Sequence, residues 1–171
     1  MLLRPNEYLP NVHAIDVDRL VAHGVSGLLV DLDNTLLARD TNEVSSDVLE
    51  WAASLSERGL RVCLVSNNWH ERVHDVAAEL GFGLVAKAIK PLPFAFWRAL
   101  RLLGLKAKEC AVVGDQIFTD ILGGNAIGCH TILVQPLSST DLAHTLVLRR
   151  LESLIMRCKE PMHPGGGSRP S

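Results

Sequence analysis

The sequence has no excess of charge of either sign, and this absence limits its partners. Its 17 basic and 19 acidic residues leave a formal net charge of −2. Proteins that bind nucleic acid as their main partner usually carry a basic surplus, because contacts with the phosphate backbone dominate the affinity. We therefore expect no nucleic acid among the partners of this chain.

Cysteine motifs and membrane-length apolar runs are also missing. The four cysteines form no C-x-x-C pair, and two of them, Cys63 and Cys110, lie in short apolar runs. We interpret them as reduced, mostly buried thiols. No apolar run approaches the length that crosses a membrane, and the start M-L-L-R-P-N-E holds no apolar signal core. These features predict a cytoplasmic protein.

The chain has no internal repeat and no G-x-x-x-x-G-K-[ST] motif, which disfavours nucleotide kinases of the P-loop type. From Pro161 the sequence reads P-M-H-P-G-G-G-S-R-P-S, a composition that cannot pack into a core. We expect a single domain over residues 1–158, followed by a disordered tail over 159–171.

What the chain does contain is a regular alternation of short apolar runs and helical patterns. This alternation predicts an α/β protein, with a Rossmann-like parallel sheet covered by helices on both faces. The expected strands cover 27–31, 60–66, 83–88, 110–115 and 131–134, and the expected helices cover 45–59, 70–81, 93–104, 118–126 and 140–158. In the first of these helices, Ser45 or Ser46 is the expected cap, Gly59 the expected end, and Val48, Leu49, Ala52 and Leu55 the apolar stripe.

Polar residues follow the predicted strands, at the carboxyl edge where parallel sheets carry their chemistry. They are Asp31 and Asp33 after the first strand, Ser66 after the second, Lys90 beyond the third, and Asp115 and Asp120 after the fourth. A second D-x-D pair, Asp16 and Asp18, follows no strand, and we interpret it as a helix cap.

Taken singly, each of these residues has an ordinary structural interpretation. The segment D-L-D-N-T can be a polar turn, Ser66 and Asp115 can cap helices, and Lys90 can be an exposed lysine. However, two carboxylates one residue apart repel each other, and a bound cation offsets that repulsion. Because carboxylate oxygens suit Mg²⁺, a magnesium site at this edge is the favoured interpretation.

Taken together, the motifs V-D-L-D-N-T-L, V-S-N-N, K-P and V-G-D-Q-x-x-T-D occur in the order D…S…K…D. In this the chain resembles the haloacid dehalogenase-like phosphatase superfamily, and within it the YqeG-type members of subfamily IIIA, over about residues 1–150. The resemblance implies the strand order 3-2-1-4-5, counted along the chain. It also implies a Mg²⁺-dependent phosphatase that forms an aspartyl-phosphate.

The resemblance further implies a role for each motif residue. Asp31 would be the nucleophile and Asp33 the general acid and base, with its backbone carbonyl on the metal. Lys90 would neutralise the phosphoaspartate. Ser66 and Asn67 would bind the substrate, Asp31, Asp33 and Asp115 would hold Mg²⁺, Asp120 would support them, and Thr35 and Asn34 would brace the turn.

The substrate stays open between two classes. The resemblance implies a phosphorylated lipid of the phosphatidylglycerophosphate type, and the alternative is a soluble phosphometabolite. Two other functions use similar residues: a receiver-like phospho-acceptor module and a noncatalytic scaffold. In a receiver, however, the lysine follows the other motifs, whereas Lys90 precedes Asp115.

A further motif, H-E-x-x-H at residues 70–74, is typical of zinc peptidases. We expect both histidines on the flank of one helix, beside its apolar stripe. No third zinc ligand is evident, so a solvated helix flank is the favoured interpretation, and contact between His70 and the leaving group is the alternative.

Access to the predicted site should be open, because each interval that could hold a cap domain contains only one helix.

The last predicted helix has two interpretations. Its apolar side packs on the sheet, or it lies on the inner face of a membrane as a peripheral contact. The oligomeric state is left open by the sequence. The apolar side consists of Val147, Leu148, Leu151, Leu154 and Ile155, and Arg149, Arg150 and Arg157 lie opposite.

Overall fold

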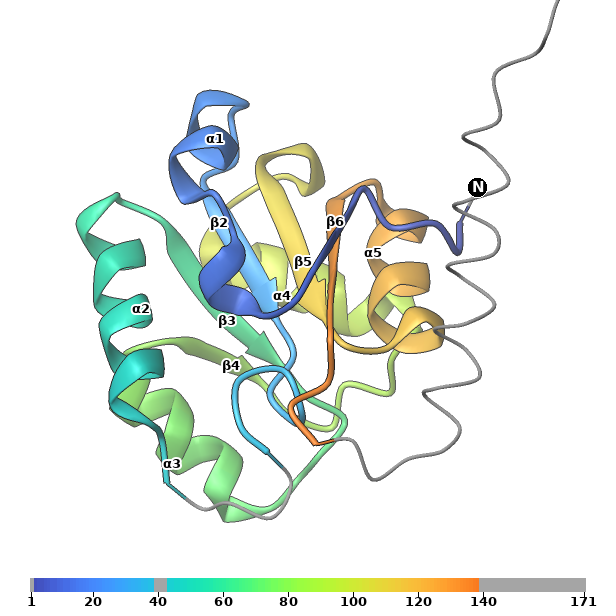
Figure 1. Cartoon of the computed structure of the whole chain (residues 1–171). Coiled ribbons are helices and arrows are strands. Elements are labelled where there is room, and N and C mark those ends of the chain that lie inside the picture. Colours follow the sequence, from blue (N-terminus) through green and yellow to red (C-terminus); the bar gives the residue numbers. More distant parts are fainter. Residues whose placement is uncertain (1, 39–42, 139–171) are drawn as a thin grey trace, which may run out of the picture. The chain divides into compact units, whose positions relative to one another are not determined.

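The structure is a computed structural model that describes residues 2–38 and 43–138. Its centre is one six-stranded sheet with the order β1-β6-β5-β2-β3-β4, in which every neighbouring pair is parallel (Figure 1). The five predicted strands are present, and their order confirms 3-2-1-4-5. The strands are β1 (Glu7–Leu9), β2 (Gly27–Val30), β3 (Arg61–Val65), β4 (Gly83–Val85), β5 (Cys110–Gly114) and β6 (His130–Val134).

The edge strand β1 was not predicted. It pairs with β6 in the register Glu7↔Ile132 to Leu9↔Val134, and Asn6 anchors its start by accepting a hydrogen bond from the backbone of Thr131 at 2.8 Å. Its three residues are only half-buried. A strand of this length is too short to show a period of two, so its existence depends on a partner that is distant in the sequence.

Helices cover both faces of the sheet, and alternate strand residues supply two separate cores. Leu28, Val30 and Leu64 face the core under α1, α2 and α3, whereas Leu29 and Val65 face the core under α4. Figure 1 shows α2 and α3 side by side on one side of the sheet. The α-helices are α1 (Val17–Ala22), α2 (Ser46–Glu57), α3 (Glu71–Leu80), α4 (Pro93–Leu103) and α5 (Leu122–Ile127), with one-turn segments η1 (Val12–Ala14), η2 (Ala107–Glu109) and η3 (Ile117–Ile121).

Most predicted helix ends are close to those observed. Asp16 caps α1 by accepting from the backbone of Arg19 at 2.9 Å, and Ser45 caps α2 by accepting from Val48, as expected. One core assignment was wrong, because Leu49 is exposed and Trp51 is buried in its place. The large indole reaches the core from a position that the aliphatic stripe left out.

The segment predicted as one helix over 118–126 is instead divided into η3 and α5. Helix α5 lies very close to α4, because a Cβ placed on Gly123 would come within 2.3 Å of the ring of Phe96. The preceding π-helical turn, η3, is a rare conformation that often marks functional sites. Residue periodicity cannot reveal such a turn.

The carboxyl edge of the sheet carries no inserted cap domain within residues 2–38 and 43–138, as predicted. No helix in this part of the chain has both the length and the apolar character needed to cross a membrane. The predicted last helix over 140–158 and the tail over 159–171 lie outside the described residues.

Candidate active site

The loop after β2 holds Asp31 at the carboxyl edge of the sheet. The backbone of Asp31 still donates to Val113 of β5 at 2.9 Å, which fixes the residue in line with the strand. The chain then turns sharply at Asn34, whose φ of 63° lies in the left-handed region that asparagine tolerates well. The hydroxyl of Thr35 donates back to Asp31 Oδ2 at 3.4 Å. The turn therefore orients the carboxylate toward the pocket.

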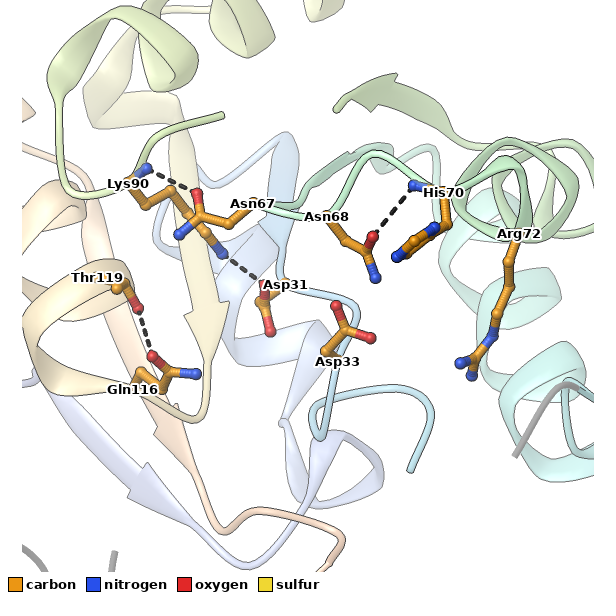
Figure 2. A pocket seen from close by; sticks show the side chains of 9 residues that line it. All are labelled: Asp31, Asp33, Asn67, Asn68, His70, Arg72, Lys90, Gln116 and Thr119. Atoms are coloured by element: carbon orange, nitrogen blue, oxygen red, sulfur yellow. Dashed lines mark hydrogen bonds and ion pairs between the residues drawn. The ribbon is translucent and has the colours of Figure 1, made fainter. Parts of the chain in front are cut away.

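Lys90 lies at the centre of the site. Its Nζ is 2.5 Å from Asp31 Oδ1 and 2.7 Å from Asp120 Oδ1, and its side chain is only 3% exposed. The backbone amide of Lys90 donates to Asn67 Oδ1 at 2.7 Å, which ties the segment after β4 to the loop after β3 (Figure 2). A buried ammonium group thus joins a carboxylate that follows β2 to one in the turn η3 after β5.

Asp115 and Asp120 follow β5, and the π-helical turn η3 brings them together. Asp120 accepts a hydrogen bond from the backbone of Gln116 at 3.2 Å, so its carboxylate folds back over the end of β5. A Cβ on Gly114 would lie 2.3 Å from this carboxylate. Glycine at this position therefore leaves the space that Asp120 fills beside Lys90.

The burial of these carboxylates changes their acidity. Burial raises the pKa of Asp31 from 3.8 to about 7, while the nearby Lys90 opposes the change. Burial, followed by repulsion from Asp31 and Asp120, raises the pKa of Asp115 to about 7. The two acids raise the pKa of Lys90 above its ordinary value, against the effect of its burial. The site therefore has more negative charge than Lys90 alone can balance.

The acidic cluster fits a divalent cation. Asp31, Asp115 and Asp120 each offer an oxygen atom, and these atoms lie within 4.8 Å of one another. Both carboxylate oxygens of Asp115 are buried without a hydrogen-bond partner among the described residues. Unpaired buried carboxylate oxygens are costly, and a hard cation such as Mg²⁺ is their natural partner.

A pocket of about 730 Å³ opens in front of these groups (Figure 2). Of the predicted site residues, Asp31, Asp33, Asn67 and Lys90 line it. In the view of Figure 2, the side chain of Asp33 lies between those of Asp31 and Arg72. The lining residues to which sequence reasoning gave no firm role are Asn68, His70, Arg72, Gln116 and Thr119.

Ser66 lies beneath the pocket and does not line it. Its side chain is fully buried, and its hydroxyl accepts a hydrogen bond from the backbone of Asn68 at 3.0 Å. This bond shapes the loop that carries Asn67 and Asn68 to the rim. The hydroxyl can still donate its own proton.

The two histidines of H-E-x-x-H do not share a helical face. His70 precedes α3 as its N-cap and lines the pocket, whereas His74 is exposed on α3. The helix begins one residue later than predicted, because Asn68 holds the backbone of His70 in an extended turn, accepting its amide at 3.1 Å. Among the described residues, the cluster suited to a metal contains neither histidine.

Comparison with known proteins gives a consistent result. Residues 8–128 match the family model of the haloacid dehalogenase-like hydrolases. The chain is 41% identical over 152 residues to the probable phosphatase YqeG of Bacillus subtilis, covering 89% of this chain and 88% of that protein.

More distant relatives and solved structures agree with this match. The chain is 30% identical to phosphatidylglycerophosphate phosphatase 1, chloroplastic, of Chlamydomonas reinhardtii, covering 88% of this chain but only 60% of the algal protein. In fold, it resembles the crystal structure of 3-deoxy-D-manno-octulosonate 8-phosphate phosphatase from Yersinia pestis. The TM-score is 0.52 at 16% identity, over 70% of this chain and 76% of that one.

Proposed function

Because the chain belongs to the haloacid dehalogenase-like hydrolases and is a phosphatase of that family, we propose that it hydrolyses phosphate monoesters through a phosphoaspartate on Asp31, with Mg²⁺ as its cofactor. One observation carries this proposal. The buried ammonium of Lys90 joins Asp31 and Asp120 beside Asp115, whose two carboxylate oxygens have no partner in the described part of the chain.

In the first step, an oxygen of Asp31 forms a bond to phosphorus while the bond from phosphorus to the leaving oxygen breaks. Asp33, which lines the same pocket, gives its proton to the leaving oxygen and is left as a carboxylate. In the second step, this carboxylate takes a proton from water as the water oxygen bonds to phosphorus. The acyl phosphate then breaks, Asp31 is restored and inorganic phosphate leaves.

The charges of the site suit this chemistry. A carboxylate nucleophile and a phosphate monoester repel each other, and Lys90, at 2.5 Å from Asp31, offsets part of that repulsion. When bound, Mg²⁺ would supply further positive charge at the phosphoryl oxygens. Asp31, Asp115 and the backbone carbonyl of Asp33 would hold the ion, with Asp120 in support through its bonds to Lys90 and Gln116.

For the substrate, we favour a phosphate monoester carried on a larger, lipid-like molecule of the phosphatidylglycerophosphate type. The relative from Chlamydomonas reinhardtii carries that name. In support, the pocket of about 730 Å³ is larger than a phosphate group needs, and no cap domain covers it within the described residues. A small soluble phosphoester is the second candidate, since the pocket is lined mainly by polar and charged residues.

Turnover in the presence of metal is the direct test of the proposed reaction. We expect repeated hydrolysis of p-nitrophenyl phosphate with Mg²⁺, loss of activity with EDTA, and recovery on adding Mg²⁺ but not Zn²⁺, because the donor set consists of oxygens. A single labelling of the protein without turnover would instead indicate a receiver-like phospho-acceptor. Comparing initial rates on phosphatidylglycerophosphate and on soluble phosphometabolites would decide between the two substrate classes.

Thermal stability gives a second, independent prediction for the metal site. Without metal, the free energy of unfolding should fall as the pH rises from about 4 to about 7, because the pKa values of Asp31 and Asp115 are raised from 3.8 to about 7. Over this pH range the folded protein keeps protons on these two carboxyls, whereas the unfolded chain has released them. The stability that results is complete only below the unfolded pKa of 3.8, and it is lost as the pH rises to about 7. Mg²⁺ should offset this loss, since it favours deprotonated ligands.

Thermal unfolding at about pH 5 and about pH 8, with and without Mg²⁺, measures this effect. The increase in Tm on adding Mg²⁺ should be larger at the higher pH. In the Asp115→Asn variant, which lacks one of the two titrating acids, the pH dependence without metal should be shallower. An equal or larger effect of Mg²⁺ at the lower pH would contradict the assignment of these acids as ligands.

A further inference from the structure

Large apolar side chains face solvent on the segments that contribute residues to the pocket lining, or continue from one of them. We name six of them the apolar rim, and each is between 48% and 69% exposed. They come from three separate segments that also line the pocket or lead directly from it. The members of the apolar rim are Trp69, Ile89, Leu92, Phe94, Trp97 and Phe118.

Members of the apolar rim are direct neighbours, along the chain, of residues that line the pocket. Trp69 lies between the pocket residues Asn68 and His70, and Ile89 and Phe118 directly precede the pocket residues Lys90 and Thr119. Each of these three pocket-lining segments therefore also carries an exposed apolar side chain. Contiguous exposed apolar groups beside a site usually mark a surface that contacts a partner or a membrane.

The segment around Lys90 continues the apolar rim onto α4. A turn closed by the Leu92 amide, which donates to the carbonyl of Ile89 at 3.1 Å, leads into the first turn of the helix. Within α4, Phe94 and Trp97 pack edge to face, with ring centroids 5.7 Å apart. The opposite side of α4, including Phe96, is buried against the sheet. The two exposed aromatic rings thus cannot be explained by packing within the described residues.

Ile89 supports a functional origin for this surface. Its φ of 55° lies in the left-handed region, where a β-branched residue is a genuine outlier. Its side chain is also 68% exposed, so core packing does not require it. Neither backbone preference nor burial within the described residues favours an isoleucine at this position.

The positive charge of residues 80–108 indicates what kind of surface the apolar rim would contact. Residues 80–108 contain no Asp or Glu, although the whole chain is slightly acidic. Arg98 and Arg101 are exposed on α4 beside Phe94 and Trp97. The segment around Trp69 contains one acidic and one basic residue, Glu71 and Arg72. The segment around Phe118 contains the acidic residue Asp120, which is bound to Lys90. The basic residues between 80 and 108 are Lys87, Lys90, Arg98, Arg101, Lys106 and Lys108.

We propose that the apolar rim docks on an anionic phospholipid bilayer, with its aromatic side chains at the level of the headgroups and the arginines of α4 against the lipid charges. Tryptophan, aliphatic and basic side chains on one surface are the combination that interfacial binding requires. The pocket then opens toward phosphate monoesters carried on lipids. This inference rests on the proposed function and adds to it the surface that presents the substrate.

Vesicle binding of the full chain tests the docking surface. With vesicles of phosphatidylglycerol and phosphatidylcholine, the Phe94→Ser/Trp97→Ser variant should sediment at least about tenfold less than the wild type, because interfacial affinity scales with buried apolar area. The matched control is Val21→Ser/Leu49→Ser, which changes two exposed apolar residues on α1 and α2 and should bind like the wild type. Arg98→Gln/Arg101→Gln should weaken binding by about fivefold per arginine.

Activity separates this inference from the proposed function. The Phe94→Ser/Trp97→Ser variant should keep the wild-type rate on soluble p-nitrophenyl phosphate, and lose rate only on phosphatidylglycerophosphate in vesicles.

If the wild type and the variant hydrolyse the soluble ester and bind vesicles equally, docking by the apolar rim is wrong and the proposed phosphatase reaction stands. If the wild type hydrolyses neither ester but the variant loses vesicle binding, the docking surface stands and the proposed reaction fails. A wild-type dimer that the double substitution converts to monomer, without vesicle binding by either, would assign the surface to a second copy of the chain and overturn the proposal.

Discussion

Replacing Asp31 with asparagine is expected to lower turnover of p-nitrophenyl phosphate by at least about 10⁴-fold, because the amide has nearly the same shape but is not a nucleophile. The fold should survive the change. The raised pKa of Asp31 means that the folded protein disfavours a charge at this buried position, and asparagine carries none.

Asp75→Asn is the matched control, since Asp75 is an exposed aspartate on α3, away from the pocket lining. Its rate and its Tm should equal those of the wild type. If Asp31→Asn keeps more than about a tenth of the wild-type rate with an unchanged Tm, the nucleophile is another group, because loss of a true nucleophile costs several orders of magnitude.

The second large effect is expected from Lys90→Met, which keeps the length of the side chain and removes its charge. Asp31 and Asp120 would then remain buried without a counter-charge, and breaking a buried ion pair in this way typically costs about 3–5 kcal/mol. We also expect the rate of the Mg²⁺-dependent reaction to fall by about 10²–10³-fold, since one preorganised cation is lost from the reacting centre.

The pH dependence of this destabilisation shows its origin. Without Lys90 the two acids hold their protons more tightly, so the stability gap between variant and wild type should narrow as the pH falls from about 8 to about 5. Chemical denaturation at both pH values measures the gap, with the exposed Lys108→Met as the control. A variant as stable as the wild type at both pH values would show that Lys90 does not hold these carboxylates.

Much of the fold was predictable because its central strands are buried on both faces and alternate with helices along the chain. The runs G-L-L-V and C-A-V-V-G are wholly buried in β2 and β5, and such runs identify strands without reference to their partners. The strand β1 and the π-helical turn η3 depend instead on distant contacts, with β6 and with Lys90 respectively. Local sequence carries no signal for either.

The candidate site also has residues that the local sequence predicts and residues that depend on distant contacts. Asp31, Lys90, Asp115 and Asp120 were expected to meet because parallel strands bring their carboxyl ends to one edge, and the structure brings them together. Arg72 was missed because an arginine on a helix flank looks like an ordinary solvated residue. Its place in the pocket lining follows from where α3 begins, which depends on the turn at Asn68.

The apolar rim also had no visible sequence signal. Phe94 and Trp97 stand in a helix most of whose other apolar residues are buried, with Leu102 as an exposed exception, so their exposure appears only once the helix is placed against the sheet. The membrane contact expected from the sequence was assigned to the helix predicted over 140–158, which lies outside the described residues. We propose instead that the membrane contact is made by the apolar rim, where substitutions can test it.

The central claim is that Asp31 carries the phosphoryl group during turnover, and trapping that group tests it most directly. Borohydride reduces an acyl phosphate to an alcohol, so wild-type protein quenched during turnover of p-nitrophenyl phosphate with Mg²⁺ should yield a peptide in which Asp31 has become homoserine. Mass spectrometry of the digested protein should find this change in the wild type and not in Asp31→Asn. Steady turnover with no modified aspartate, or with the modification at another residue, would contradict the account.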